Sequence, residues 1–318
     1  MDANHSDILI VGAGMAGLAC ATQLAREARS IRVLDKGRGP GGRMAARRTE
    51  IAGAVVSFDH GAQYFTARSS GFQDAVSDWH RQGIVDRWEA AGPEAWVGVP
   101  GMNAPIRAMA ASLDVHWSTR AETIERSGSL WSVATQDTVF TANTLLIAVP
   151  AEQAAVLLSQ AAPELAEIAR SVQSEPCWAV MASFDSSLGA ASDIFRDPDA
   201  AVSWAARNSA KPGRSSTESW VLHASPDHSR SLIDADRDTA AQTLLDDFFA
   251  QTGIEPAVPS HLTAHRWLYA MPNALSGDPA RFDHVNQIGI AGDYLHSPRV
   301  EGAWISGHAL AEAVLSAA

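Results

Sequence analysis

The sequence contains very little lysine. Among its 318 residues are 24 lysines and arginines, and only Lys36 and Lys211 are lysines. Aspartate and glutamate together number 36, which gives a formal net charge of −12 at pH 7. Proteins that bind nucleic acids or anionic membranes need a clustered basic surface, which this composition does not provide. We therefore expect neither as a partner.

Cysteine is equally scarce, with only Cys20 and Cys177, far apart in the chain. Neither belongs to a Cys-x-x-Cys or Cys/His spacing, so we expect no metal site and no disulfide. No stretch approaches the 18 uninterrupted apolar residues that a membrane-spanning helix needs. The first apolar run is interrupted by glycines and lacks the basic segment of a signal peptide. The expected location is cytoplasmic.

The sequence does contain a complete strand–turn–helix motif near its start. An apolar strand at residues 8–11 runs directly into Gly12-x-Gly14-x-x-Gly17. In such a motif the first glycine permits a tight turn, the second lets a pyrophosphate approach the backbone, and the third lets the helix pack closely. Phosphates then lie at a helix N-terminus, where free N–H groups favour anions. A second apolar run ends in Asp35, where a ribose-binding acid is expected. These residues predict a dinucleotide-binding βαβ unit.

The rest of the chain predicts two kinds of architecture, because apolar runs of α/β type give way after about residue 150 to strands with a period of two. Helices are expected at 18–26, 71–82, 99–113, 152–171, 234–251 and from about 299 onward. Strands are expected at 31–34, 115–118, 121–126, 131–135, 144–149, 178–184, 201–208, 220–225, 262–270 and 287–292.

We therefore predict an α/β fold with a Rossmann-like dinucleotide-binding domain and a second, α+β substrate domain that contains an antiparallel sheet. A buried strand near the C-terminus ends in Gly-Asp, so the first domain is expected to open the chain and also to close it. The predicted dinucleotide domain covers 1–75, 99–152 and 284–318. The predicted substrate domain covers 76–98 and 153–283.

Three short motifs favour flavin over nicotinamide as the resident cofactor. Arg38-x-x-Gly41-Gly42-Arg43 resembles the second glycine motif of flavin amine oxidases, in which backbone N–H groups and an arginine meet the pyrophosphate and the ribityl side. The strand that ends at Pro150 and the Gly292-Asp293 pair resemble segments of two-dinucleotide-domain flavoproteins. The resemblance implies FAD, held noncovalently because no cysteine or histidine lies in the usual attachment context.

Longer segments resemble the bacterial renalase family, which belongs to the amine-oxidase-like flavoproteins. They are residues 35–44, 59–67, 204–213, 265–270 and 299–304. The resemblance runs from Ile8 to about Ala311. It implies an FAD-dependent oxidase that transfers a hydride from 2- or 6-dihydro isomers of NAD(P)H to flavin N5. The products are NAD(P)+ and, with dioxygen, hydrogen peroxide.

The resemblance also implies which residues contact FAD. Gly302 and Ala303 are expected to direct N–H groups at the flavin N1–C2=O edge, because a helix N-terminus stabilises negative charge. Asp293 is expected to accept from a ribityl hydroxyl or to act through water. Glu301 is expected to pair with Arg299 or Arg43, unless it is simply a first-turn helix acid. The full set is Gly12, Ala13, Gly14, Met15, Ala16, Gly17, Asp35, Lys36, Gly41, Gly42, Arg43, Gly61, Ala62, Gln63, Ala121, Pro150, Gly292, Asp293, Glu301, Gly302 and Ala303.

On the substrate side we single out Gln63, Tyr64, Asn208, His223 and His265. Gln63 and Tyr64 follow a Gly-Ala pair and could face the flavin ring, and the alternative for both is core packing. Asn208 could bind a carboxamide or could occupy a turn. Each histidine is either a substrate contact or a core group whose hydrogen bonds are satisfied within the protein.

Arg207, Lys211 and Arg214 form the only local basic cluster. They could bind substrate phosphates, or they could be solvated loop charges. Many flavin amine oxidases place a lysine near flavin N5, and the scarcity of lysine here disfavours that chemistry. Two alternatives to the dihydronicotinamide oxidase stay open: an amine oxidase or related dehydrogenase, and a flavin-binding protein without turnover. The preference for NAD or NADP isomers and the oligomeric state are not determined by the sequence.

Overall fold

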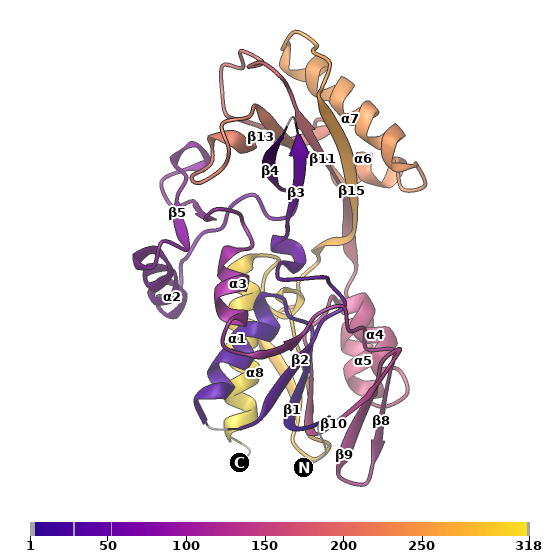
Figure 1. The fold of residues 1–318 in the computed structure, drawn as a ribbon. Helices are drawn as coiled ribbons and strands as arrows, with labels where there is room; N and C mark the ends of the chain where they lie inside the picture. The colour runs from indigo at the N-terminus through magenta and orange to yellow at the C-terminus, as the bar shows by residue number, and fades with distance from the viewer. Residues whose placement is uncertain (1–3, 28, 52, 317–318) are drawn as a thin grey trace.

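The computed structural model describes residues 4–27, 29–51 and 53–316. It contains two large sheets, one in the lower part of Figure 1 and one in the upper part. Both ends of the described chain lie in the lower part, so its first and last segments belong to the same half of the molecule. No helix in the described ranges is long and apolar enough to span a bilayer.

The lower sheet has eight strands, and its parallel core has the order β17-β10-β1-β2-β7. Strand β16 pairs antiparallel with β17 at one edge, and β8 and β9 extend the first half of β10. The strands are β1 (His5–Val11), β2 (Ile31–Leu34), β7 (Asp114–His116), β8 (Thr123–Ser127), β9 (Leu130–Ala134), β10 (Val139–Ile147), β16 (Ala280–Asp283) and β17 (Ile288–Ala291).

Helices cover both faces of this sheet because its central strands are apolar on both sides. Ile8 and Ile10 of β1 belong to one hydrophobic cluster, with α1 and α8, whereas Leu9 and Val11 belong to a second cluster, with α4 and α5. The helices are α1 (Met15–Leu24), α3 (Ala104–Ala110) and α8 (Val300–Ser316) on the first face, and α4 (Ala151–Leu158) and α5 (Pro163–Arg170) on the second.

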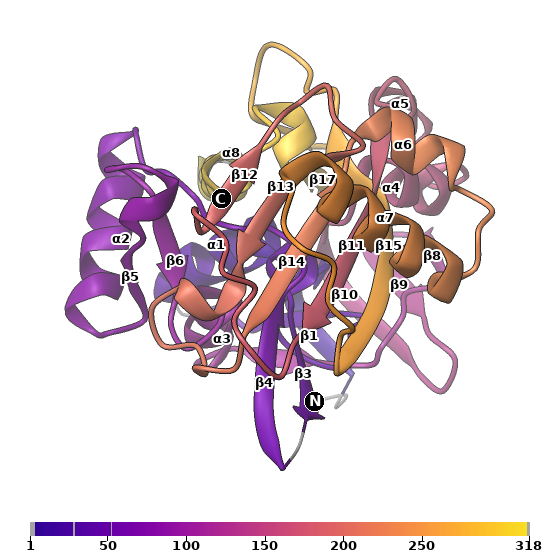
Figure 2. The ribbon, with the colours of Figure 1, turned by 90° about the horizontal axis from the view of Figure 1, so that it is seen from above.

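The upper sheet is antiparallel, with the order β12-β13-β14-β11-β15. One face is covered by α6 (Pro226–Ser231) and α7 (Arg237–Thr252), as Figure 2 shows. The carboxylate of Asp236 caps the N-terminus of α7, and Gly253, in the left-handed region, follows its last residue. The strands are β11 (Ser174–Ser183), β12 (Ile194–Arg196), β13 (Val202–Arg207), β14 (Ser219–Ala224) and β15 (His261–Pro272). The predicted fold class is confirmed.

The β3–β4 hairpin (Ala46–Ile51 and Ala54–Asp59) rises into the upper part of the molecule. There Val56 and Phe58 pack against Met181 and Val221 of the upper sheet. Helix α2 (Ser70–Arg81) and the ribbon of β5 (Val85–Arg87) and β6 (Trp96–Gly98) instead share a hydrophobic cluster with α1 and α8. We therefore propose that the hairpin belongs with the substrate domain and residues 76–98 with the dinucleotide domain, unlike the division expected from the sequence.

Two predicted helices differ from those observed. The helix expected at 99–113 begins only at Ala104, because residues 100–103 form a turn and Pro105 occupies its first turn. The helix expected at 152–171 is divided in two by Pro163, which begins α5. The strands β3, β4, β5, β6, β12 and β16 were not predicted from the sequence. Single 3-10 turns lie at Ala25–Glu27, Gly42–Met44, Glu89–Ala91, Asn208–Ala210 and Asp293–Leu295.

Candidate active site

The turn between β1 and α1 has the geometry that its glycines predict. Gly12 has φ +110°, and a Cβ there would lie 2.4 Å from the carbonyl oxygen of Ala148. A Cβ on Gly17 would lie 1.9 Å from the oxygen of Gly12, so both positions require glycine. A Cβ on Gly14 would meet no atom within 4 Å. Gly14 therefore leaves open space at the start of α1, as a pyrophosphate site needs.

Asp35 holds this turn in place from the end of β2. One carboxylate oxygen accepts from the N–H of Ala13 at 2.7 Å, and the other accepts from Gly37 at 2.6 Å. Lys36 is exposed, and its ammonium donates to Gln153 at 2.9 Å. Asp35 thus joins the first glycine turn to the second glycine loop, and Lys36 lies on the surface beside α4.

Arg43 connects the second glycine loop to the end of β17. Its guanidinium donates to both carboxylate oxygens of Asp293, at 2.8 and 2.6 Å. The Asp293 side chain is 7% exposed. Asp293 is therefore paired with Arg43 within the protein, and its expected contact with a ribityl hydroxyl or a water stays a prediction. The carbonyl of Arg43 also accepts from Ala62 at 2.8 Å, and a Cβ on Gly61 would lie 2.1 Å from that carbonyl oxygen.

Glu301, in the first turn of α8, pairs with neither Arg299 nor Arg43, so that expectation is wrong. Its carboxylate accepts from the N–H groups of Arg68 and Ser69 and from the Ser69 hydroxyl, at 2.7–3.0 Å. Burial alone would raise the pKa of Glu301, but these hydrogen bonds outweigh it and lower the pKa. Glu301 therefore binds the segment that leads into α2.

The first turn of α8 leaves fewer free amides than expected. The N–H of Ala303 donates to the carbonyl of Arg299 at 3.1 Å and is not available to a ligand. Gly302 precedes that first helical hydrogen bond, so its N–H remains free. A Cβ on Gly302 would lie 2.1 Å from the Ser297 carbonyl oxygen, which explains the glycine.

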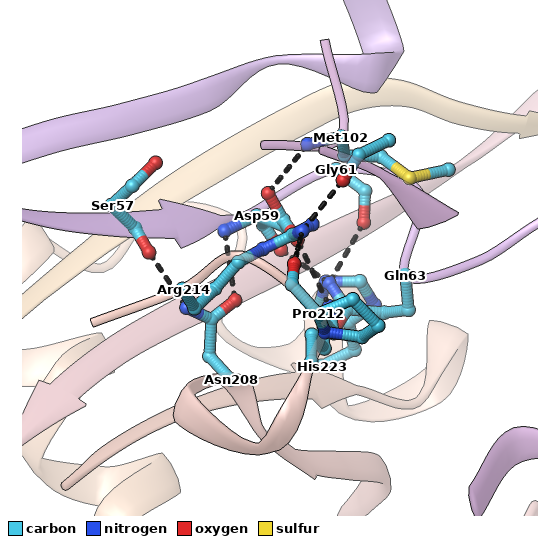
Figure 3. Close-up of polar contacts among 11 residues, drawn as sticks. Ser57, Asp59, Gly61, Gln63, Met102, Asn208, Pro212, Arg214 and His223 are labelled. Atoms are coloured by element: carbon cyan, nitrogen blue, oxygen red, sulfur yellow. Dashed lines mark hydrogen bonds and ion pairs between the residues drawn. The ribbon is translucent and has the colours of Figure 1, made fainter. Parts of the chain in front are cut away.

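Gln63 is the best-anchored of the predicted substrate contacts (Figure 3). Its side chain is 6% exposed, and its amide nitrogen donates to the carbonyls of Asp59 and Gly61. The same nitrogen lies 3.4 Å from Nε2 of His223, and the amide oxygen accepts from the Lys211 ammonium at 3.0 Å. These partners fix the orientation of the Gln63 amide.

Asp59 is at the centre of a buried ion network with Lys211 and Arg214. One of its carboxylate oxygens lies 2.5 Å from the Arg214 guanidinium and 3.3 Å from the Lys211 ammonium, and all three side chains are fully buried. The other oxygen accepts from the N–H of Met102 at 2.9 Å (Figure 3). Two cations thus face one carboxylate, which leaves a net positive charge inside the protein.

The pKa values in this network follow from burial and charge. Burial alone would raise the pKa of Asp59, but the two cations outweigh it and lower the pKa. Burial lowers the pKa of Lys211 to about 8, although Asp59 opposes the shift. Arg207 lies apart and pairs with Asp193 at 3.1 Å and Glu218 at 3.5 Å. The interpretation as solvated loop charges is therefore wrong for Lys211 and Arg214, and all three cations of the predicted basic cluster are paired with carboxylates within the protein.

Asn208 is fully buried, and both ends of its amide bind the β4 backbone. Its oxygen accepts from the N–H of Asp59 at 3.2 Å, and its nitrogen donates to the carbonyl of Ser57 at 2.6 Å (Figure 3). Asn208 therefore joins the β3–β4 hairpin to the upper sheet, and its expected contact with a substrate carboxamide stays a prediction.

His223 and His265 lie on the same face of the upper sheet. Ala179 of β11 pairs with His223 on one side and with His265 on the other, and residues directly opposite in antiparallel strands share a face. This face is turned toward Gln63 and His60. His60, which the sequence analysis did not single out, stacks on Trp267 at 5.3 Å and meets the His265 ring edge-on at 5.1 Å.

All three histidines are held neutral at pH 7. Burial lowers the pKa of His60 to about 3 and the pKa values of His223 and His265 to about 4. Neighbouring positive charges contribute to each shift: Lys211 acts on His223, and Arg47 acts on the other two. These rings can donate or accept hydrogen bonds, but they are not acids at neutral pH.

Tyr64 belongs to an aromatic pair at the edge of this region. Its ring lies 5.5 Å from the Trp204 ring, and its hydroxyl accepts from Arg196 at 3.1 Å. The Arg196 guanidinium lies 4.7 Å from the Trp204 ring centre, which is a cation–π contact. Arg196 thus already provides the cation that this pair of rings could bind.

Together, a Rossmann-like turn, a second glycine loop and a facing antiparallel sheet define a two-domain flavoprotein oxidoreductase. Residues 10–82 match the NAD(P)-binding Rossmann-like domain, and residues 81–315 match the flavin-containing amine oxidoreductases. The chain belongs to the flavin-containing amine oxidoreductase family. Its cofactor is FAD, and the open space at Gly14 fits the pyrophosphate of that cofactor.

Solved structures share this fold at low identity. A protein from Exiguobacterium sp. 255-15, provisionally assigned as a protoporphyrinogen oxidase, is 14% identical with a TM-score of 0.77 and 99% of each chain covered. Putrescine oxidase bound to putrescine is 14% identical (TM-score 0.68), and cyclohexylamine oxidase from Brevibacterium oxydans IH-35A is 13% identical (TM-score 0.66). For both, 98% of this chain and 99% of the other are covered. At these identities the likeness concerns the fold alone.

Proposed function

We propose that this chain is a renalase-like oxidase of 2- or 6-dihydro isomers of NAD(P)H. In the proposed reaction the isomer loses a hydride and becomes aromatic NAD(P)+. One proton and one dioxygen take up the hydride equivalent, which gives hydrogen peroxide. When bound, FAD supplies the two-electron acceptor that links the two half-reactions.

The observation that carries this proposal is the charge of the site. Asp59 is outnumbered by Lys211 and Arg214, and Asp293 is neutralised by Arg43. The nearby histidines are neutral, so they do not change the charge of the site. A site of this kind attracts an anionic dinucleotide and repels the ammonium form of an amine.

The protein's own contribution in this reaction is orientation. A dihydropyridine is already a strong hydride donor, so the site has to hold its ring in one pose and needs no acid or base. Lys211 fixes the Gln63 amide oxygen, and the backbone of the 59–61 segment fixes the amide nitrogen. Gln63 and His223 therefore present a rigid polar edge to which a carboxamide can hydrogen-bond.

Two observations speak against an amine substrate, although many relatives act on amines. The Tyr64–Trp204 pair, which could form an aromatic cage for an ammonium group, already has Arg196 beside it. Lys211 is engaged by Asp59 and Gln63, where it serves to fix a side chain. Lys211 therefore has protein groups as its hydrogen-bond partners, unlike the lysine that many flavin amine oxidases place near flavin N5 through a water molecule.

Product analysis in air tests the proposed function. The holoprotein is incubated with 6-dihydroNAD, and NAD+ and hydrogen peroxide are quantified together. The proposal predicts one molecule of each per isomer consumed and little turnover of ordinary NADH. Turnover of putrescine or cyclohexylamine with no turnover of the isomer would instead establish the amine oxidase alternative. If neither is turned over, the flavin-binding protein without turnover is favoured.

A further inference from the structure

Three arginines that come from separate parts of the chain lie close enough for their charges to interact: Arg38 of the second glycine loop, Arg47 of β3 and Arg237 at the start of α7. We call them the arginine cluster. Arg47 lies directly opposite Phe58 in the hairpin register, so the two side chains share a face. The Phe58 ring lies 5.8 Å from the ring of His261 on β15. Arg47 is therefore directed toward the sheet face that carries His261 and His265.

The arginine cluster is not neutralised by the protein. Within the described ranges, none of its members forms an ion pair or a side-chain hydrogen bond. Burial and the charges of Arg237 and Arg38 lower the pKa of Arg47, and no carboxylate opposes them. The Asp236 carboxylate next to Arg237 is occupied as the cap of α7. The chain has 36 acidic residues, and none of them forms an ion pair with these three arginines in the described ranges, so their charges are available to a ligand.

The cluster lies within electrostatic reach of the proposed ring-binding residues. The charges of Arg47 and Arg237 both act on His265, which shares its sheet face with His223, the neighbour of Gln63. In a nicotinamide nucleotide, only a ribose separates the ring from the first phosphate. A ring at Gln63 and a phosphate at the cluster can therefore belong to one molecule.

We propose that the arginine cluster is the subsite that binds the phosphate groups of the dinucleotide substrate. This inference rests on the proposed function and adds to it a basis for selecting nucleotides over free nicotinamide compounds. Guanidinium groups suit this task because they bind phosphate oxygens with paired N–H donors. The phosphates of FAD have their own site at the start of α1, so the arginine cluster remains for the substrate.

The test measures binding to the holoprotein through changes in flavin absorbance. The ligands are NAD+, nicotinamide mononucleotide and nicotinamide riboside, which carry two, one and no phosphates. The variants are Arg47→Gln and Arg237→Gln. The matched control is Arg48→Gln, because Arg48 is exposed, pairs with Ser57 and points to the other face of the hairpin.

We expect Arg47→Gln to weaken NAD+ binding by about tenfold or more, the effect of losing a charge-assisted hydrogen bond. Riboside binding should change by less than about twofold, and Arg48→Gln should resemble the unmodified protein. Added salt should weaken NAD+ binding in the unmodified protein more than in Arg47→Gln. Flavin content should be equal in all of these proteins.

Three outcomes would overturn the inference: equal weakening of all three ligands, an equal effect of Arg48→Gln, or loss of FAD from Arg47→Gln. The last would assign Arg47 to the phosphates of FAD. Failure of the proposed function would give a different result. If NAD+ binding depends on the phosphates but the isomers do not reduce the flavin, the phosphate subsite is supported and the oxidase function is rejected. If the isomers reduce the flavin but Arg47→Gln binds NAD+ as the unmodified protein does, the oxidase function is supported and the phosphate subsite is rejected.

Discussion

At the scale of single residues, the site depends on buried charges that balance one another incompletely. Asp59, Lys211 and Arg214 are all fully buried, and the carboxylate is the only anion among them. Removing one member of a buried ionic group leaves its partners without compensation, which costs far more than the pair itself contributes. Asp59 is therefore the member on which the local structure depends most.

Replacing Asp59 with asparagine keeps the shape and removes the charge. We expect Asp59→Asn to lower the free energy of unfolding by about 3–5 kcal/mol, because two buried cations then lack an anion. Urea denaturation measures the change. The matched control is Asp78→Asn, which breaks an exposed pair with Arg81 and should cost about 0.5 kcal/mol or less. Equal effects of the two substitutions would contradict the account.

The buried histidines predict a dependence of stability on pH. His60 has its pKa lowered to about 3 in the folded protein, against about 6.5 when unfolded. Between these values the unfolded chain binds more protons, so stability is complete above about pH 6.5 and falls as the pH drops toward 3. The slope contributed by one such group approaches about 1.4 kcal/mol per pH unit.

His60→Gln should flatten this slope, although it also lowers stability at every pH by removing the stacking on Trp267. Urea denaturation at pH 7.5 and pH 5 measures the slope. The exposed His284, changed to glutamine, serves as the control and should leave it unchanged. A slope that is identical with and without His60 would show that this ring is not held neutral.

At the scale of elements, two close approaches build the cofactor domain. Helix α8 packs on α1 at Gly307, where a Cβ would lie 2.1 Å from the carbonyl oxygen of Ala16. Two residues before Ala16, at the N-cap of α1, Gly14 has open space around it. One glycine therefore serves packing between helices, and the other serves the approach of a ligand.

Substituting these two glycines should separate folding from cofactor binding. Alanine favours a helix by about 1 kcal/mol over glycine, but overpacking costs about 1–3 kcal/mol. Because the contact at Gly307 is with rigid backbone, we expect Gly307→Ala to lower stability by about 1–2 kcal/mol in net terms. Gly14→Ala should leave apoprotein stability within about 0.5 kcal/mol and weaken FAD binding by about tenfold or more, equivalent to 1.4 kcal/mol.

Denaturation of the apoprotein and FAD titration measure the two quantities separately. Gly14 already has φ −83°, which alanine adopts without strain, so a folding defect is not expected there. A stable Gly14→Ala protein with unchanged FAD affinity would contradict the placement of the pyrophosphate.

Elements with strong local signals were predictable from the sequence, and those defined by distant contacts were not. The β1–α1–β2 unit and α7 follow from glycine spacing, capping and apolar periodicity. The β3–β4 hairpin was missed because its pattern is half polar and its burial comes from Met181 and Val221 of another sheet. The division of 152–171 at Pro163 could have been read from the proline itself.

At the scale of the whole molecule, an acidic protein surrounds a positively charged site. The formal net charge is −12, yet the site contains Lys211, Arg214 and Arg43 and has the arginine cluster within electrostatic reach. Candidate residues such as Gln63 and His223 could be named from the sequence, and the fold places the amide nitrogen of Gln63 3.4 Å from Nε2 of His223. The sequence could not assign the cations, because whether an arginine is buried, paired or free depends on segments more than 100 residues away.

The same limit explains why the basic segment 207–214 was misinterpreted. Its charges are adjacent in sequence, but their carboxylate partners come from β4, from residue 193 and from residue 218. The cations that remain without a partner come instead from three separate elements. Only the folded chain shows which positive charges are available to a ligand.

The most direct test of the central claim is anaerobic reduction of the protein-bound flavin. Oxidised holoprotein is mixed with 6-dihydroNAD, with 2-dihydroNAD, with ordinary NADH and with putrescine, and flavin absorbance is followed. The account predicts rapid bleaching with one or both isomers and none with NADH or putrescine on that timescale. Rapid bleaching by putrescine, with the isomers inert, would contradict it.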